Sequence, residues 1–286
     1  MKVFQIYIVI PAYNEEQFIA TTLTSLCKQS LLPAKILVVN DNSTDLTLSI
    51  CKEFQSKYNF VQVISHHSSH EHQPGSKVIN AFNYGLSQLD TNYDIICKYD
   101  ADLIFPLNYL EEIAKIFTKD ATLGMVGGFC YIKTKTGWQL ENLTNKDHIR
   151  GALKAYRKEC FKAIGGLAPE MGWDTVDEIK TRYHHWKIKT IPELQVKHLK
   201  PTGAKYQKKA GKNQGIAFYR MRYGGVLTII ASFKLALLKK KPFLIIDYIK
   251  GYFIARKTNQ TFLLSKQEGA FLRKERWKGI KQKLSL

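Results

Sequence analysis

Short apolar runs alternate with helically spaced apolar positions from residue 8 to residue 117. The runs have the length of buried strands, and apolar positions three and four apart mark one face of a helix. This alternation predicts βαβ units and a mainly parallel sheet flanked by helices, which is an α/β fold. The expected strands lie at 8–10, 36–39, 60–64 and 93–99, and the expected helices at 18–26, 46–54, 78–89 and 110–117.

Polar residues follow three of these strands at the point where each strand ends. Asn14 and Glu15 follow the first strand, Asp41 ends the second, and Asp100 and Asp102 follow the fourth. In open α/β sheets, ligands bind outside the carboxyl ends of the strands. The sequence therefore predicts a ligand site at this edge of the sheet.

Two of the polar stretches also predict helix starts. Asn14 is expected to cap the first helix, with Glu15 and Glu16 in its first turn, and Ser43 or Thr44 to cap the second. A cap alone is the alternative role for Asn14. The residues before Asn14 read as a strand and not as a signal peptide, because their apolar stretch is short and has no cleavage site.

The segment Asp100-Ala101-Asp102 carries the strongest chemical signal. Hard cations such as Mg²⁺ take oxygen ligands and keep positions open for phosphate oxygens. Two carboxylates one residue apart can therefore bind such a cation together with a phosphate. An isolated Asp-x-Asp is more often a solvated turn, and the series of three polar strand exits favours the metal site.

The three stretches together resemble the motifs of family 2 glycosyltransferases, which have the GT-A fold. Residues 11–16 match the opening motif, residues 39–45 the second motif, and Asp100 with Asp102 the metal motif. The resemblance covers roughly the first 200 residues and has the three motifs in the right order. It departs from the family pattern at Asn40, where an aspartate is common.

The resemblance implies roles for these residues in binding a nucleotide-sugar donor. Asp102 would bind Mg²⁺ or Mn²⁺, Asp100 would contact the ribose or the metal, and Asp41 would recognise the nucleotide base. Asn14 and Glu15 would line the same site. The other implied donor-site residues are Pro11, Ala12 and Tyr13 beside the base, and Lys77 or Asn80 near a phosphate or the sugar, although residues 75–80 equally fit a plain helix start.

A carboxylate of the acceptor half would act as general base. Residues 161–167 match the family's glycine-pair segment, and residues 172–178 follow where the family has an acidic motif. Anchoring the segment on Arg182 puts residues 175–176, Thr-Val, at the usual Glu-Asp. Because a base needs only hydrogen-bond reach to the acceptor hydroxyl, three candidates remain. Our order of preference is Asp177, Asp174 and Glu178.

Two groups of histidines could bind a metal, and the sequence favours only the first. His198 resembles the family histidine that completes the metal or phosphate site, and a neutral imidazole can ligate a metal. A purely structural histidine is the alternative. The histidines of residues 66–72 lack a second ligand pair spaced as in structural zinc sites, so we read this run as a polar loop.

The positive charge is concentrated at the C-terminal end. The chain carries +19, of which +18 falls in residues 200–286. This asymmetry predicts an anionic partner surface, either a membrane leaflet or nucleic acid. The apolar runs 226–238 and 243–256 are shorter than the roughly 20 residues that span a bilayer. Their flanking lysines favour interfacial helices on an anionic membrane, and a packed helical pair is the alternative.

Three further features of the sequence bear on the compartment, the type of enzyme and the chain's organisation. The five cysteines contain no Cys-x-x-Cys pair, which argues against a disulfide framework and fits a reducing compartment. A processive synthase is expected to carry Gln-x-x-Arg-Trp, but Arg273 stands in place of the glutamine, which favours addition of a single sugar. Residues 203–215 are basic and contain glycine, so we expect a loop there.

We therefore predict an inverting, metal-dependent glycosyltransferase that moves one sugar from a nucleotide-diphosphate sugar to a glycan or lipid-linked acceptor in surface polysaccharide synthesis. Residues 1–105 would form the nucleotide-sugar half and 106–200 the acceptor half of a GT-A domain, followed by a basic helical region, 201–286. The protein would be cytoplasmic, at the inner face of the cell membrane. The alternatives are a metal-dependent nucleotidyltransferase and a protein that binds nucleic acid through its basic region, although no specific nucleic acid is expected.

Overall fold

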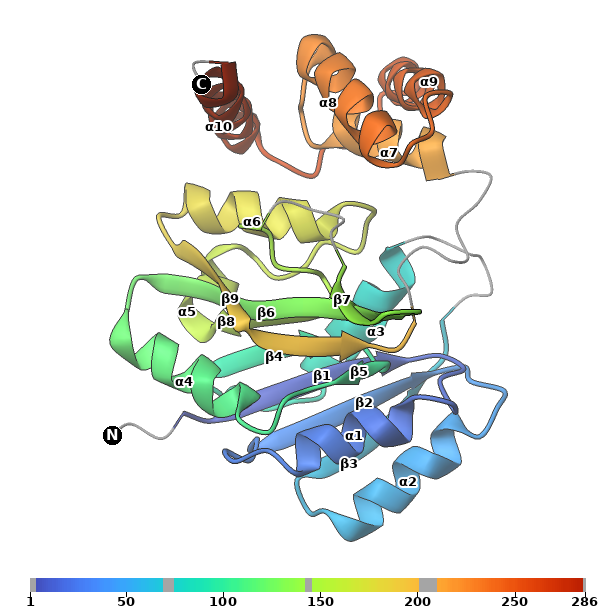
Figure 1. Cartoon of the computed structure of the whole chain (residues 1–286), viewed down its shortest axis with the longest axis vertical. Helices are drawn as coiled ribbons and strands as arrows, with labels where there is room; N and C mark the ends of the chain where they lie inside the picture. Colours follow the sequence, from blue (N-terminus) through green and yellow to red (C-terminus); the bar gives the residue numbers. More distant parts are fainter. Residues whose placement is uncertain (1–3, 69–74, 142–145, 201–209, 285–286) are drawn as a thin grey trace. The chain divides into compact units, whose positions relative to one another are not determined.

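The computed structural model describes residues 4–68, 75–141, 146–200 and 210–284 (Figure 1). The chain divides into two compact units. The sheet unit comprises Met1–Pro169 and His184–Thr202, and the helical unit comprises Glu170–Tyr183 and Gly203–Leu286. Each unit is described by itself.

The sheet unit is built on one mixed sheet, which has nine strands within the described ranges. Their order is β3-β2-β1-β4-β8-β6-β9-β5, and β7 pairs with β6. The neighbours from β3 to β4 are parallel, whereas β8 is antiparallel to both β4 and β6. The strands are β1 (Ile6–Ala12), β2 (Lys35–Asp41), β3 (Val61–His66), β4 (Ile95–Tyr99), β5 (Leu103–Ile104), β6 (Leu123–Thr134), β7 (Gly137–Leu140), β8 (Leu153–Arg157) and β9 (Lys187–His198).

Helices flank this sheet and form nearly all of the described part of the helical unit. Those of the sheet unit are α1 (Ile19–Cys27), α2 (Thr47–Lys57), α3 (Ser76–Ser87), α4 (Tyr109–Lys119) and α5 (Lys158–Ala163). Those of the helical unit are α6 (Trp173–Tyr183), α7 (Ala210–Arg220), α8 (Gly225–Leu238), α9 (Leu244–Lys257) and α10 (Lys266–Leu284).

The predicted α/β fold is confirmed, because β1 to β4 and α1 to α4 occupy the expected ranges with their ends shifted by a few residues. The apolar residues of β1 from Ile6 to Ile10 are all buried, as expected for a parallel strand covered on both faces. Helix α3 lies close to the sheet because residue 85 is glycine. A Cβ there would lie 2.5 Å from Val39 and 2.9 Å from Val9.

The helical unit has its own apolar core, to which Val176, Phe218, Leu227 and Leu272 contribute. Helix α7 begins inside the stretch predicted as a basic loop, of which residues 203–209 lie outside the described ranges. Of the helices described, none has the length and apolar character needed to cross a membrane.

Candidate functional site

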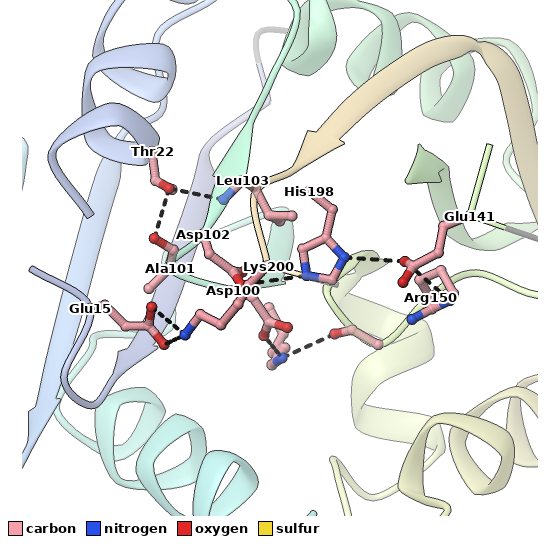
Figure 2. A network of polar contacts seen from close by, with 12 residues as sticks. Glu15, Thr22, Asp100, Ala101, Asp102, Leu103, Glu141, Arg150, His198 and Lys200 are labelled. Carbon is pink, nitrogen blue, oxygen red and sulfur yellow. Dashed lines mark hydrogen bonds and ion pairs between the residues drawn. The ribbon is translucent and has the colours of Figure 1, made fainter. Parts of the chain in front are cut away.

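Strand pairing brings His198 to the exit of β4. The chain leaves β4 through residues 100–102 and enters β5, which pairs with β9 so that Leu103 lies opposite His198. The backbone N–H of Leu199 donates to the backbone oxygen of Asp102 at 2.9 Å. Two segments far apart in the sequence therefore meet at one edge of the sheet (Figure 2).

The imidazole of His198 lies between two carboxylates (Figure 2). Its Nε2 is 3.5 Å from Oδ2 of Asp102. Its Nδ1 is 3.2 Å from Oε2 of Glu141, and the same oxygen lies 3.4 Å from Arg150. Asp102, His198 and Glu141 are all buried. Sequence reasoning missed Glu141 and Arg150, because both lie outside the recognisable motifs.

These contacts set the charge of His198. Burial opposes the charged imidazole, but hydrogen bonds to Asp102 and Glu141 and their negative charges together raise the pKa of His198 to about 9. The ring of the metal-free protein is therefore protonated at neutral pH. A cation bound at Nε2 would release this proton, because a ligating imidazole is neutral.

The other carboxylate of the motif, Asp100, pairs with a buried lysine. Nζ of Lys98 contacts Oδ1 of Asp100 and donates to the backbone oxygen of Gly151 at 3.1 Å. The charge of Asp100 is thus balanced from within the sheet, whereas the carboxylate of Asp102 faces His198.

Thr22 of α1 holds the turn between these carboxylates in place. Its hydroxyl donates to the backbone oxygen of Ala101 at 2.8 Å and accepts from the backbone N–H of Leu103 at 2.9 Å. Because Thr22 is fully buried, these bonds are shielded from water. The turn is therefore fixed by a helix that precedes it by many residues.

Glu15 of the opening motif reaches the same region through Lys200 (Figure 2). Nζ of Lys200 lies 2.5 Å and 2.7 Å from the two carboxylate oxygens of Glu15. Burial raises the pKa of Glu15, and Lys200 partly offsets this rise. The ion pair ties the opening motif to the segment after His198.

The first two motifs are hydrogen-bonded to each other. Oδ1 of Asn14 accepts from the backbone N–H of Thr44 at 2.9 Å, and the backbone N–H of Asn14 donates to Oγ of Ser43 at 3.0 Å. The backbone N–H of Glu15 donates to Oγ1 of Thr47 at 2.8 Å. The motifs that follow β1 and β2 are therefore joined to each other by hydrogen bonds.

Both predicted helix caps are corrected by this arrangement. Helix α1 begins only at Ile19, and Asn14 has a φ of 52°, in the left-handed region, with its side chain bonded to the second motif. Helix α2 begins at Thr47, whose backbone N–H donates to Asp45 at 3.0 Å and not to residues 43–44. The short polar side chains bind the neighbouring loop in place of the helix ends.

Asp41 is buried at the end of β2 and accepts several hydrogen bonds. The backbone N–H and hydroxyl of Ser68 donate to it at 3.1 Å and 2.9 Å, and Nδ1 of His66 lies 3.1 Å from it. The neighbouring Asn40 has a buried side-chain oxygen without a hydrogen-bond partner in the described part of the chain. Because an unpaired buried acceptor is costly, Asn40 is a candidate ligand contact.

The first two histidines of residues 66–72 contact the second motif. His66 lies against Asp41, and Nδ1 of His67 is 2.8 Å from Oδ1 of Asn42. The remaining histidines, His70 and His72, lie outside the described residues. Among groups of three or more His, Cys, Asp or Glu in the described ranges, one has its possible ligand atoms within 4.8 Å of one another, namely Cys130, Glu141 and His198.

The side chains at the exit of β4 fit a divalent cation. Asp102 offers a carboxylate oxygen, a ligand type that suits Mg²⁺ and Mn²⁺, and His198 offers an imidazole nitrogen, a common ligand of divalent metals. Glu141 contacts the second ring nitrogen, as outer carboxylates do for many metal-ligating histidines. Asp100, two positions before Asp102, is paired with Lys98.

The remaining predicted donor-site residues lie on β1, directly after it, and on α3. Ala12 is buried at the end of β1 beside half-buried Pro11, whereas Tyr13 is 58% exposed. Lys77 and Asn80 lie in the first two turns of α3, which confirms the helix start predicted there. Because α3 connects two parallel strands, β3 and β4, these turns lie at the edge where β3 ends.

The three candidate bases lie on α6 of the helical unit. Asp174 is in the first turn, and Asp177 and Glu178 follow at helical spacing on the same side. Asp177 is 1% exposed and accepts from the backbone N–H of Glu178 at 2.6 Å. The carboxylate of Glu178 lies 3.4 Å from Arg182.

Acidic and amide side chains lie at the carboxyl ends of β1, β2 and β4, where open α/β sheets bind their ligands. A family model described as Glycosyl transferase family 2 matches residues 7–169, more than half of the chain. The chain belongs to this family, which confirms the resemblance seen in the sequence.

Its curated relatives are longer proteins. It is 37% identical over 103 residues to the probable glycosyltransferase YdaM of Bacillus subtilis (strain 168), a match that covers 34% of this chain and 23% of that protein. A match to an uncharacterized glycosyltransferase of Haemophilus influenzae is 30% identical over 125 residues, 44% of this chain and 36% of that protein. The matches thus span about a quarter to a third of these relatives' length.

Solved structures share the fold at low identity. The mannosyltransferase PcManGT from Pyrobaculum calidifontis, in complex with GDP-Man and Mn²⁺, superimposes with a TM-score of 0.60 at 15% identity, covering 98% of this chain and 81% of that chain. S. aureus TarS 1-349 in complex with UDP-GlcNAc gives 0.59 at 18% identity, covering 89% and 74%. The sheet unit has the GT-A fold of these glycosyltransferases.

Proposed function

We propose that the protein is a metal-dependent glycosyltransferase that moves one sugar from a nucleotide-diphosphate sugar to a glycan or lipid-linked acceptor, with inversion at the anomeric carbon. The observation that carries the proposal is the meeting of Asp102 and His198 at the exit of β4. Relatives named as glycosyltransferases and solved neighbours with nucleotide sugars support it.

Asp102 and His198 would hold Mg²⁺ or Mn²⁺, with Asp100 at the metal or the ribose. The bound cation would act as a Lewis acid that neutralises the diphosphate leaving group. In our proposal Asp41 and Asn40 contact the base. The other donor contacts would be Pro11, Ala12, Tyr13, Asn14 and Glu15 near the nucleotide, and Lys77 or Asn80 near a phosphate or the sugar.

A carboxylate of α6 would take the proton from the acceptor hydroxyl, with Asp177 preferred over Asp174 and Glu178. The acceptor oxygen would then attack the anomeric carbon from the face opposite the diphosphate. A single displacement of this kind inverts the configuration and needs no nucleophile from the protein. A positioned general base contributes about 10²–10⁴-fold to such a step.

We also propose that the helical unit binds an anionic membrane surface. The outward face of α8 carries five apolar side chains that are 37% to 74% exposed, at helical positions i, i+3, i+4, i+7 and i+11: Val226, Ile229, Ile230, Phe233 and Leu237. The buried side carries smaller and more polar side chains, because beside Leu227 it holds Thr228, Ser232 and Ala236. A helix that packs only on its own domain has the reverse distribution.

The charge of this region favours an anionic bilayer as the partner. Residues 225–257 hold seven Lys or Arg and one Asp, and Lys239, Lys240 and Lys241 are exposed in the turn after α8. Helix α9 adds exposed Ile246 and Phe253. Apolar burial combined with lysine attraction is typical of interfacial helices. Nucleic acid would bind the basic side chains but would leave the apolar face of α8 exposed to water.

A release assay tests the proposed reaction. The purified protein is incubated with Mn²⁺ and a panel of nucleotide sugars, and release of the nucleoside diphosphate is measured with and without candidate acceptors. The proposal expects acceptor-stimulated release from one donor, and an inverted anomeric configuration in the product by NMR. Release of pyrophosphate from a nucleoside triphosphate and sugar phosphate would instead identify a nucleotidyltransferase.

A further inference from the structure

The carboxylate of Glu141 has a position that the proposed donor and acceptor roles leave unexplained. Glu141 follows β7, and its backbone N–H donates to the backbone oxygen of Cys130 on β6 at 2.9 Å. Strand β6 in turn pairs with β9, which ends at His198. The β6–β7 hairpin therefore places a buried carboxylate 3.2 Å from Nδ1 of His198.

We propose that Glu141, itself held by Arg150, is a positioning residue that orients His198 and selects the tautomer able to ligate the cation. This inference rests on the proposed metal site at Asp102 and His198. A neutral imidazole carries its proton on one nitrogen only. With Glu141 accepting from Nδ1–H, the lone pair of Nε2 points toward Asp102.

Removal of Glu141 removes this selection. The neutral ring is then free to carry its proton on Nε2, where Asp102 becomes the acceptor. In that tautomer Nε2 has no lone pair for a cation. Arg150, 3.4 Å from Glu141, places a positive charge beside this buried carboxylate and helps to hold it in position.

Direct Mn²⁺ binding, followed by electron paramagnetic resonance, tests the proposal in the full chain. Glu141→Ala should weaken Mn²⁺ binding about 10–100-fold, the range found for outer partners of metal ligands. Glu141→Gln keeps an oxygen for Nδ1–H and should stay within a few-fold of wild type. Asp90→Asn is the matched control, because it removes a carboxylate–lysine pair with Lys35 at the opposite edge of the sheet.

A second readout does not depend on the metal. The ¹⁵N shifts of the His198 ring, recorded above its pKa in metal-free protein, should show the proton on Nδ1 in wild type and a mixture of tautomers in Glu141→Ala. If that variant does not fold because Arg150 has lost its contact with Glu141, the double variant Glu141→Met/Arg150→Met removes both charges and should show the same mixture.

Three results would overturn the proposal. They are Mn²⁺ binding by Glu141→Ala equal to wild type, an unchanged tautomer, or a tightly held Zn²⁺ that is lost in Cys130→Ala but kept in Asp102→Ala. The last result would make Cys130, Glu141 and His198 a metal site in their own right. If Asp102→Ala binds Mn²⁺ like wild type, the proposed metal site fails, and the tautomer readout still decides the role of Glu141.

Discussion

Asp102 is the side chain on which the proposed chemistry depends most. Asp102→Ala should abolish turnover and leave the fold intact. The hydrogen bond by which residue 102 supports the fold is accepted by its backbone oxygen from the N–H of Leu199, and alanine keeps that oxygen. Turnover by this variant in the release assay, together with its thermal unfolding, checks the prediction. Unchanged turnover, or full wild-type activity in excess EDTA, would contradict it.

The choice of base is a second prediction at the scale of single residues. Asp177→Asn should lower turnover about 10²–10⁴-fold and leave donor binding nearly unchanged, because a base acts on the acceptor and not on the donor. Asp174→Asn is the matched comparison on the same helix. If Asp174→Asn loses turnover and Asp177→Asn keeps it, Asp174 and not Asp177 is the general base.

The candidate site residues were easier to predict than the residues that hold them in place. The sequence indicated Asp102 and His198 through local motifs, and the structure brings them together. Glu141, Thr22 and Lys200 were missed, because each meets the site through strand pairing or a helix contact between distant segments. The spacing of residues within a short segment cannot predict such contacts.

Among the elements, α7 and α9 cross with their backbones in contact. A Cβ at Gly215 would lie 1.9 Å from the backbone oxygen of Tyr248, and one at Gly251 would lie 2.0 Å from that of Lys212. Gly215→Ala should therefore destabilise the helical unit by about 1–3 kcal/mol or more, the usual cost of overpacking. Thermal or denaturant unfolding measures the change.

Gly279 of α10 provides the control for this prediction, because a Cβ there meets nothing within 4 Å. Gly279→Ala should stabilise by up to about 1 kcal/mol through helix propensity. Equal effects of the two alanines would show that α7 and α9 do not touch as described.

Periodicity predicted the elements from β1 to α4, because each is a regular strand or an amphipathic helix. It did not predict the mixed part of the sheet, where β8 is antiparallel and β6 lies beside β9. Nor did it indicate that α6 groups with the C-terminal helices in one compact unit, since we placed a single boundary near residue 200. Strand order and helix partners depend on packing between distant segments, and the hydrophobic period of one segment cannot predict this packing.

At the scale of the whole molecule, the charge asymmetry and the outward face of α8 predict salt-sensitive binding to anionic vesicles. Replacing Lys239, Lys240 and Lys241 by Gln should weaken binding roughly 100-fold, at about 1 kcal/mol for each basic residue. Ile229→Asp/Phe233→Asp should weaken binding to anionic and neutral vesicles alike. Co-sedimentation measures both variants.

Leu107→Ser is the control for the vesicle experiment, because Leu107 is an apolar residue of the sheet unit that is more exposed than Ile229 or Phe233. It should bind vesicles like wild type. Equal binding of wild type to anionic and neutral vesicles would contradict the role of the lysines, and unchanged binding by the α8 variant would contradict the role of its apolar face.

Metal-dependent binding of a nucleotide is the central claim, and ligand-induced thermal stabilisation tests it most directly. Nucleoside diphosphates and nucleotide sugars are added to wild type and to Asp102→Ala, with Mn²⁺ or with EDTA. A ligand that binds only the native state at 100 times its Kd stabilises by about 2.7 kcal/mol. The account predicts such a rise in Tm for wild type with Mn²⁺, and its loss in EDTA and in Asp102→Ala. Equal stabilisation under all of these conditions, or none with any nucleotide, would contradict it.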